Sequence, residues 1–271
     1  MVKIIVSFFL AFCILSGDMI DDKIKSFIGE KEYLSSKKII NILLGEKEQY
    51  YLDGQRVDVV KLMKVLKKNG FMRLDLKGVN SINITFATKS NPLIFLRILN
   101  SVLNSMGFNF YITKKVFKSD DTFLWTIQMN SEYLVDPVVM SNELKKYGCF
   151  IVDITKKSKT DWRYLISSSN AKLLSQNIKK EVSYKLNKPI KRYWLRLDDV
   201  PEMIYIKSYP LNRWHPYISF FNDKLDVLFV YCDDEVSGNL KLDIPPGTKY
   251  IMIDDKYTIS NIRSGLKIYT K

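Results

Sequence analysis

The chain of 271 residues has few of the side chains on which most catalytic and metal sites depend. His215 is its only histidine, so a metal site or an acid–base pair built from several histidines is excluded. It has neither a C-x-x-C pair nor a G-x-S-x-G turn, which argues against thiol redox, structural zinc and α/β-hydrolase chemistry. The sequence therefore predicts a protein that is not an enzyme and has no catalytic residue, metal or cofactor.

Cysteine is also scarce, with three residues at Cys13, Cys149 and Cys232. Cys13 lies in an N-terminal apolar stretch that we expect to be removed. Cys149 and Cys232 would then remain in an oxidising compartment, where they could form a disulfide. Two separate buried thiols are the alternative.

A long apolar run is missing as well. Ile4 to Leu15 is apolar for about a dozen residues, which is short for a membrane span. Lys3 precedes this run, and the acidic Asp18 follows soon after it. This order predicts a signal peptide over residues 1–17 and a periplasmic location, with an uncleaved membrane anchor as the rival interpretation.

The net charge of +13 is concentrated in the first two thirds of the chain. Residues 18–190 hold 29 basic and 18 acidic side chains, whereas residues 191–271 hold 12 and 11. A basic surface can attract nucleic acid, anionic lipid or an acidic glycan. Export makes nucleic acid an unsuitable partner and leaves anionic lipid and an acidic glycan or peptidoglycan. Solvated lysines are nevertheless the commoner role for this excess of positive charge.

Residues 51–170 contain one pattern three times: a helix, a glycine, a short apolar strand, a turn and a second strand. The glycines are Gly70, Gly107 and Gly148, a spacing that indicates an array of modules. Asn91-Pro92 and Asp136-Pro137 are typical helix starts. The expected helices cover 57–68, 92–105 and 137–146, and the expected strand pairs cover 71–76 with 82–88, 108–112 with 123–129, and 149–154 with 162–168. We expect each helix to cover its own small antiparallel sheet.

Within this region, residues 51–54, the following helix, Gly70 and the strands at 71–76 and 82–86 resemble the small α/β modules in the periplasmic part of secretins. Such modules occur in ring-building envelope proteins, where sheet edges and helix faces mediate self-association or docking. The chain lacks the long series of amphipathic strands that a secretin pore needs. The resemblance therefore implies an accessory protein and not the channel.

Helical patterns flank the repeat region on both sides. Residues 18–50 are polar and predict an N-terminal helical segment. In residues 171–190, Leu174, Ile178, Val182 and Leu186 recur every four positions, which predicts a linking helix.

Residues 191–271 lose the helical pattern and predict a β-sandwich of eight short strands separated by turn residues. The expected strands are 193–197, 203–209, 217–221, 227–232, 239–243, 249–253, 257–262 and 266–269. The segments 217–223 and 242–253 resemble a pair that recurs in galactose-binding-like jelly rolls. That resemblance implies a fold but no particular ligand, because such domains bind glycans or proteins.

A loop between strands supplies the candidate ligand site. Arg213, Trp214, His215 and Tyr217 lie together there, and an aromatic side chain can stack on a sugar ring. A structural loop with a half-buried Trp214 is the alternative. The acidic groups at 233–235 and 254–255 could hold Ca²⁺, but solvated turn residues are the simpler interpretation.

Together these patterns predict an α+β protein with three α-β-β modules, a linking helix and a C-terminal β-sandwich. The expected function is that of a non-enzymatic periplasmic scaffold or assembly component of an envelope machine, such as a secretion apparatus, pilus or flagellar motor. Its partners would be envelope proteins or further copies of itself. A glycan- or peptidoglycan-binding protein is the second interpretation, and an envelope hydrolase is the third.

Overall fold

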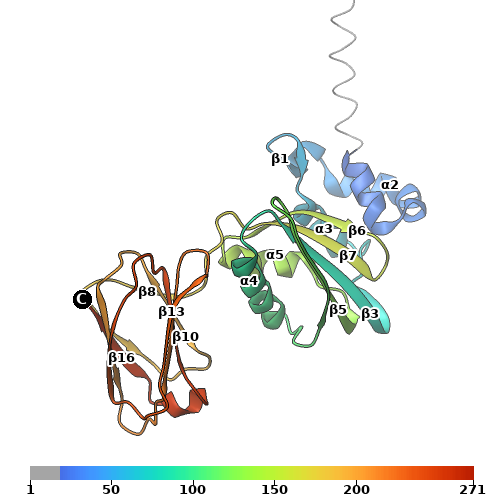
Figure 1. Cartoon of the computed structure of the whole chain (residues 1–271). Coiled ribbons are helices and arrows are strands. Elements are labelled where there is room, and N and C mark those ends of the chain that lie inside the picture. The colour runs from blue at the N-terminus through green and yellow to red at the C-terminus, as the bar shows by residue number, and fades with distance from the viewer. Residues whose placement is uncertain (1–18) are drawn as a thin grey trace, which may run out of the picture. The chain divides into compact units, whose positions relative to one another are not determined.

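The computed structural model describes residues 19–271, so the predicted signal peptide at 1–17 lies outside the described residues. Helices make up 26% of the chain and strands 38%, in several sheets, which confirms the α+β class. The chain divides into two compact units, the first ending at Lys172 and the second covering Leu173–Lys271. They are described separately below as unit 1 and unit 2 (Figure 1).

Unit 1 begins with helical structure at 19–28 and α2 (Glu30–Leu44), as the polar N-terminal segment predicted. The turn η1 (Lys47–Tyr50) and a two-stranded hairpin, β1 (Tyr51–Leu52) with β2 (Arg56–Val57), follow. Ile40 and Leu44 of α2 are buried, whereas Ile39 and Ile42 are exposed. Only one side of this helix therefore packs against the unit.

A five-stranded sheet forms the centre of unit 1, in the order β4-β5-β3-β7-β6. Only β3 and β7 are parallel to each other, and every other neighbouring pair is antiparallel. The strands are β3 (Asp75–Thr88), β4 (Ile112–Lys118), β5 (Phe123–Tyr133), β6 (Phe150–Lys156) and β7 (Asp161–Ser167). Buried side chains alternate along β5 and β7, as expected for a sheet with one covered face.

Three helices cover that face: α3 (Val59–Lys68), α4 (Pro92–Ser105) and α5 (Pro137–Lys146) (Figure 1). Asn91 and Asp136 cap α4 and α5 through side-chain oxygens that accept backbone N–H bonds, which confirms both predicted helix starts. Gly148 follows α5 at φ +71°, and a Cβ there would lie 2.4 Å from the Asn170 carbonyl oxygen. Glycine is thus required both by the backbone angle and by the close approach.

The expected separate sheets are wrong, because all five strands join one sheet. The first copy has one long strand, β3, where two strands and a turn were predicted, and residues 71–74 are not in a strand. The residues of the predicted turn lie within β3, at a shift in its register with β5 between Asp75 and Asn80. In the second copy the strand is β4, at 112–118, and not 108–112. Pairing across the shared sheet decides where the strands lie.

Unit 2 consists of two sheets that share one buried cluster of side chains. The first has the order β13-β12-β15-β10-β8 and the second the order β14-β11-β16-β9. The strands are β8 (Gln176–Ile178), β9 (Ser183–Leu186), β10 (Tyr193–Leu197), β11 (Met203–Ser208), β12 (Pro216–Phe221), β13 (Val227–Cys232), β14 (Asn239–Asp243), β15 (Tyr250–Asp255) and β16 (Leu266–Thr270).

The predicted linking helix over 171–190 is wrong. This segment forms β8, which pairs with β10, and β9, which pairs with β16. Ile178 and Leu186 are buried in the shared cluster, but Leu174 and Val182 are exposed, so the spacing of four does not mark one helix face. The expected strand at 257–262 is also wrong, because Ile259–Ile262 forms the short helix η2.

Candidate functional site

The predicted sugar-binding loop does not present its tryptophan to solvent. Trp214 is fully buried in the cluster of unit 2, and its indole Nε1 donates a hydrogen bond to the Asp254 carbonyl oxygen at 3.0 Å. Arg213 is exposed, and His215 and Tyr217 are half-buried. The stacking role considered for Trp214 is therefore wrong, because its ring has no accessible face. The alternative of a structural loop fits, with Trp214 fully buried where half burial was expected.

His215 belongs to a hydrogen-bonded turn organised by Asp255. The buried Asp255 carboxylate accepts bonds from the amides of His215 (2.7 Å), Tyr257 (2.9 Å) and Thr258 (3.0 Å), and from Asn261 Nδ2 (3.0 Å). Burial alone would raise the pKa of Asp255, but these bonds together lower it. This network holds a turn in place, and the described residues place no serine or cysteine in hydrogen-bond contact with the imidazole.

The acidic groups at 233–235 and 254–255, considered for Ca²⁺ with solvated turn residues as the simpler interpretation, do not gather around one point. Residues 19–271 contain no set of three or more His, Cys, Asp or Glu side chains arranged to hold a metal ion. Asp234 instead pairs with Lys256 and accepts a hydrogen bond from the Tyr257 hydroxyl at 2.6 Å. Asp254 forms an ion pair with Arg192 at 3.3 Å. These carboxylates serve turns and surface ion pairs.

Both described cysteines are free. Cys149 is fully buried in unit 1, where burial raises the pKa of its thiol to about 11. Cys232 is exposed on β13 in unit 2. A thiol without solvent exposure in one unit cannot bond to a thiol on the surface of the other without local unfolding. The candidate Cys149–Cys232 disulfide is therefore not formed.

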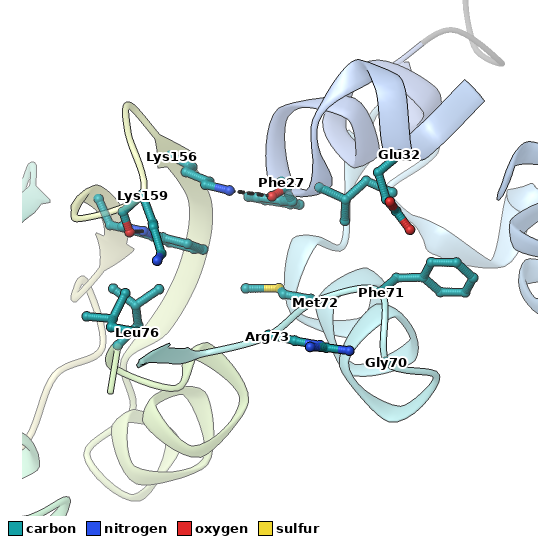
Figure 2. Close-up of a pocket in the computed structure, with 12 residues that line it drawn as sticks. Phe27, Glu32, Gly70, Phe71, Met72, Arg73, Leu76, Lys156 and Lys159 are labelled. Carbon is teal, nitrogen blue, oxygen red and sulfur yellow. Dashed lines mark hydrogen bonds between the residues drawn. The ribbon is translucent and has the colours of Figure 1, made fainter. Parts of the chain in front are cut away.

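A cavity of about 360 Å³ in unit 1, called the basic pocket here, collects cationic and apolar side chains (Figure 2). Its cations are Arg73, Lys156 and Lys159, and its lining includes one acidic residue, Glu32. The remaining lining residues are Phe27, Ile28, Gly70, Phe71, Met72, Leu76, Leu134 and Trp162. An anionic ligand with an apolar or ring-shaped portion matches this combination.

The three cations of the basic pocket differ in their surroundings. Lys156 donates a hydrogen bond to the Phe27 carbonyl oxygen at 2.6 Å, and burial together with nearby Lys159 lowers its pKa. Within residues 19–271, Arg73 and Lys159 form neither an ion pair nor a side-chain hydrogen bond, and both are exposed. Figure 2 shows the two lysines on the opposite side of the cavity from Met72 and Arg73. Arg73 and Lys159 are thus available to an incoming anion.

The two edges of the unit 1 sheet differ sharply. At the β6 edge, Lys156 bonds the carbonyl of Phe27, and Lys23 pairs with Asp153 at 2.5 Å, so the N-terminal helices are anchored there. At the opposite edge, all seven residues of β4 are exposed. Residues 19–271 supply no strand for the outer side of β4. An exposed row of unpaired N–H and C=O groups is a template for another strand.

The β4 edge, residues 112–118, carries apolar and basic side chains together. Ile112 is 60% exposed, Val116 54% and Phe117 47%, and nearby Phe110 is 92% exposed. The register pairs Ile112 with Gln128 and Phe117 with Leu124, so both lie on the face that the helices do not cover. Lys114, Lys115 and Lys118 add positive charge along the strand. Isolated exposed apolar residues are common, but a continuous edge of them indicates a binding surface.

Unit 2 has a comparable strand at its own edge. Five of the six residues of β13 are exposed, including Val227, Leu228, Phe229 and Val230. β13 ends one sheet and pairs only with β12 among the described strands. Acidic Asp226 precedes the strand and Asp233 follows it directly. We call residues 227–232 the β13 edge.

Sequence reasoning overlooked the β4 edge and the basic pocket for different reasons. Residues 113–118 were predicted to be a turn because lysines interrupt the apolar residues. The β-branched Thr113 and Val116 were the signal that favoured a strand. The basic pocket joins residues near positions 27, 72 and 156–162, whose proximity depends on the fold. The excess of lysine was the only available signal for it.

The comparisons with known proteins give no match: no family model, curated protein or solved structure is similar to this chain. Among residues 19–271, no helix is both long enough and apolar enough to cross a membrane.

Proposed function

We propose that this protein is a non-enzymatic scaffold or assembly component of a periplasmic envelope machine. The observation that carries the proposal is the β4 edge, an exposed strand of apolar and basic residues opposite an edge that the same unit covers. β-Strand addition at such an edge provides main-chain hydrogen bonds and side-chain pockets together. The resemblances of residues 51–170 to secretin-like modules and of residues 191–271 to galactose-binding-like jelly rolls fit a protein made of docking units.

Self-association and docking to other envelope proteins both belong to this proposal. Two sequence features support it: the predicted signal peptide and the shortage of catalytic side chains. In unit 2 the residues that suggested a ligand site support a turn, so that unit is proposed to contribute a docking surface. The name of the machine, whether secretion apparatus, pilus or flagellar motor, must come from its partners.

In-cell crosslinking of a C-terminally tagged chain tests this function. We expect a fixed set of envelope proteins, or further copies of the chain, to co-purify and be identified by mass spectrometry. The double variant Ile112→Ser, Phe117→Ser should lose them, because it removes two of the three exposed apolar side chains of β4. The matched control is Arg213→Ala, an exposed change in unit 2, which should retain them. Recovery of the tagged chain alone would overturn the proposal.

A second candidate function is the binding of an acidic glycan or peptidoglycan fragment, and the basic pocket favours it. Arg73 and Lys159 would pair with carboxylates while the half-buried Ile28 and Phe71 of the same lining supply apolar contact. We expect Arg73→Ala with Lys159→Ala to weaken binding of soluble peptidoglycan fragments at least about tenfold. Lys68→Ala with Lys89→Ala removes the same charge elsewhere in unit 1 and should leave binding unchanged. Equal binding by both double variants would exclude the basic pocket.

A further inference from the structure

The chain contains two exposed apolar edge strands whose charges are opposite. β4 carries Lys114, Lys115 and Lys118 and has no acidic residue within it. β13 has no basic residue, and Asp226, Asp233 and Glu235 lie just outside its ends. Residues 19–271 hold no ion pair for any of these six side chains. Each strand thus has unneutralised charge of the sign that suits the other.

We infer that the partner of the β4 edge is the β13 edge of a second copy of this chain. The inference rests on the proposed function and names one partner for it. Main-chain hydrogen bonds would join two five-stranded sheets edge to edge, and neighbouring apolar side chains on the two strands would cover part of each other's exposed surface. Lys118, at the end of β4, would lie beside an acidic group at one end of β13, and Lys114 and Lys115 would add positive charge along the strand between the two acidic ends.

Pairing of like strands is less favourable for both edges. Two β4 strands side by side would bring lysines from both copies together, and two antiparallel β13 strands would bring Asp226 of one copy close to Asp233 of the other. Like charges placed opposite each other across a strand pair are destabilising. Charge therefore selects the mixed pair. Opposite charges lie a little further out, at Asp120 and Asp121 after β4 and at Lys224 before β13, so the favourable charges are those on β4 and directly beside β13.

The mixed pair has a consequence for assembly. Every copy would offer one β4 edge and one β13 edge, so each contact leaves a free edge at both ends of the assembly. Contacts between different surfaces build rings when the rotation closes and open filaments when it does not. An assembly larger than a dimer is therefore expected at high protein concentration.

Charge exchange between copies tests the inference. Variant A carries Lys115→Glu and Lys118→Glu on β4, and variant B carries Asp226→Lys and Glu235→Lys beside β13. All four side chains are exposed, so both variants should fold, which circular dichroism and thermal melting check. Light scattering over a concentration series should show that the native chain associates. Variant A alone and variant B alone should each associate at least about tenfold more weakly than the native chain.

Association in a mixture of variants A and B tests whether β4 of one copy pairs with β13 of another. The acidic β4 edge of A matches the basic β13 surroundings of B, and the native β4 edge of B matches the native β13 edge of A. Association should therefore return in the mixture and in one chain carrying all four changes. Failure of the mixture to associate would overturn the inference, whether or not the chain with all four changes associates. If native chains stay monomeric while β4 still captures other envelope proteins in cells, the scaffold proposal stands without self-pairing.

Discussion

The loop around Trp214 and the strand β4 differ in opposite ways from what the sequence predicts. The loop contains an aromatic residue, a histidine and an arginine, which in sequence suggest a ligand site. In the structure Trp214 is fully buried, and Asp255 holds the turn through four hydrogen bonds. Residues 113–118 look like a turn in sequence, yet β4 leaves all seven of its side chains and one row of backbone groups exposed.

This difference separates residues that stabilise the fold from residues that are free to bind. A polar or aromatic group whose contacts are already complete within the chain has little binding capacity left. An edge strand with unpaired backbone groups and apolar side chains in water gains free energy when a partner covers it. Changes in the loop should consequently alter stability, and changes in β4 should alter association.

The largest expected effect is a loss of stability when Trp214 in the loop is replaced. Trp214→Ala removes a fully buried side chain and its hydrogen bond to the Asp254 carbonyl. We expect the free energy of unfolding of unit 2 to fall by about 3–5 kcal/mol, the usual cost of deleting a large core aromatic residue. Urea denaturation followed by circular dichroism measures this loss. Arg213→Ala, the exposed neighbour, should change stability by less than about 0.5 kcal/mol, and equal losses in both variants would contradict the assignment.

A smaller effect is expected for Asp255→Asn. In the native chain both carboxylate oxygens accept hydrogen bonds. Asparagine keeps one acceptor oxygen, but its NH₂ group would face a backbone N–H and could not accept a bond from it. We expect a loss of about 1–3 kcal/mol at neutral pH.

The pH dependence of that loss has a definite sign. The folded pKa of Asp255 is lowered, so its stabilising contribution is present above the unfolded pKa, about 3.9, and disappears as the pH falls through the folded value. The difference between the native chain and Asp255→Asn should therefore shrink below about pH 4, as urea denaturation at pH 7, 5 and 3 would show. A difference that stays constant over this range would mean that the carboxylate charge is not stabilising.

The smallest effect on stability is expected for Ile112→Ser with Phe117→Ser. Both side chains are about half exposed or more, so their removal should change the free energy of unfolding of unit 1 by less than about 1 kcal/mol. The same variant should lose its partners in the crosslinking experiment. A large loss of stability would instead show that β4 contributes to the core.

The sequence was most informative where local rules decide the structure. Asn91 and Asp136 cap their helices as predicted, and Gly70, Gly107 and Gly148 have the positive φ angles expected after a helix. The strands around β10, β12 and β14 were also placed close to their observed positions, because turn residues separate them.

Predictions failed where distant pairing decides the structure. Leu174 to Leu186 follow a helical spacing, but β8 and β9 gain hydrogen bonds at the edges of two sheets that are already formed by later residues. The same limit applies to the candidate sites. Whether Trp214 is buried, or β4 is exposed, depends on which strands and helices lie beside it, and no single sequence segment contains that information.

Residue-specific photo-crosslinking in living cells tests the central claim most directly. A photoreactive amino acid would replace Phe117 on the β4 edge in one variant and Arg213 in the loop in another, both in the full chain. We predict crosslinked products from position 117, to another copy or to an envelope protein, and none from position 213. Products from position 213 alone would contradict the account and return the loop to consideration as the binding site.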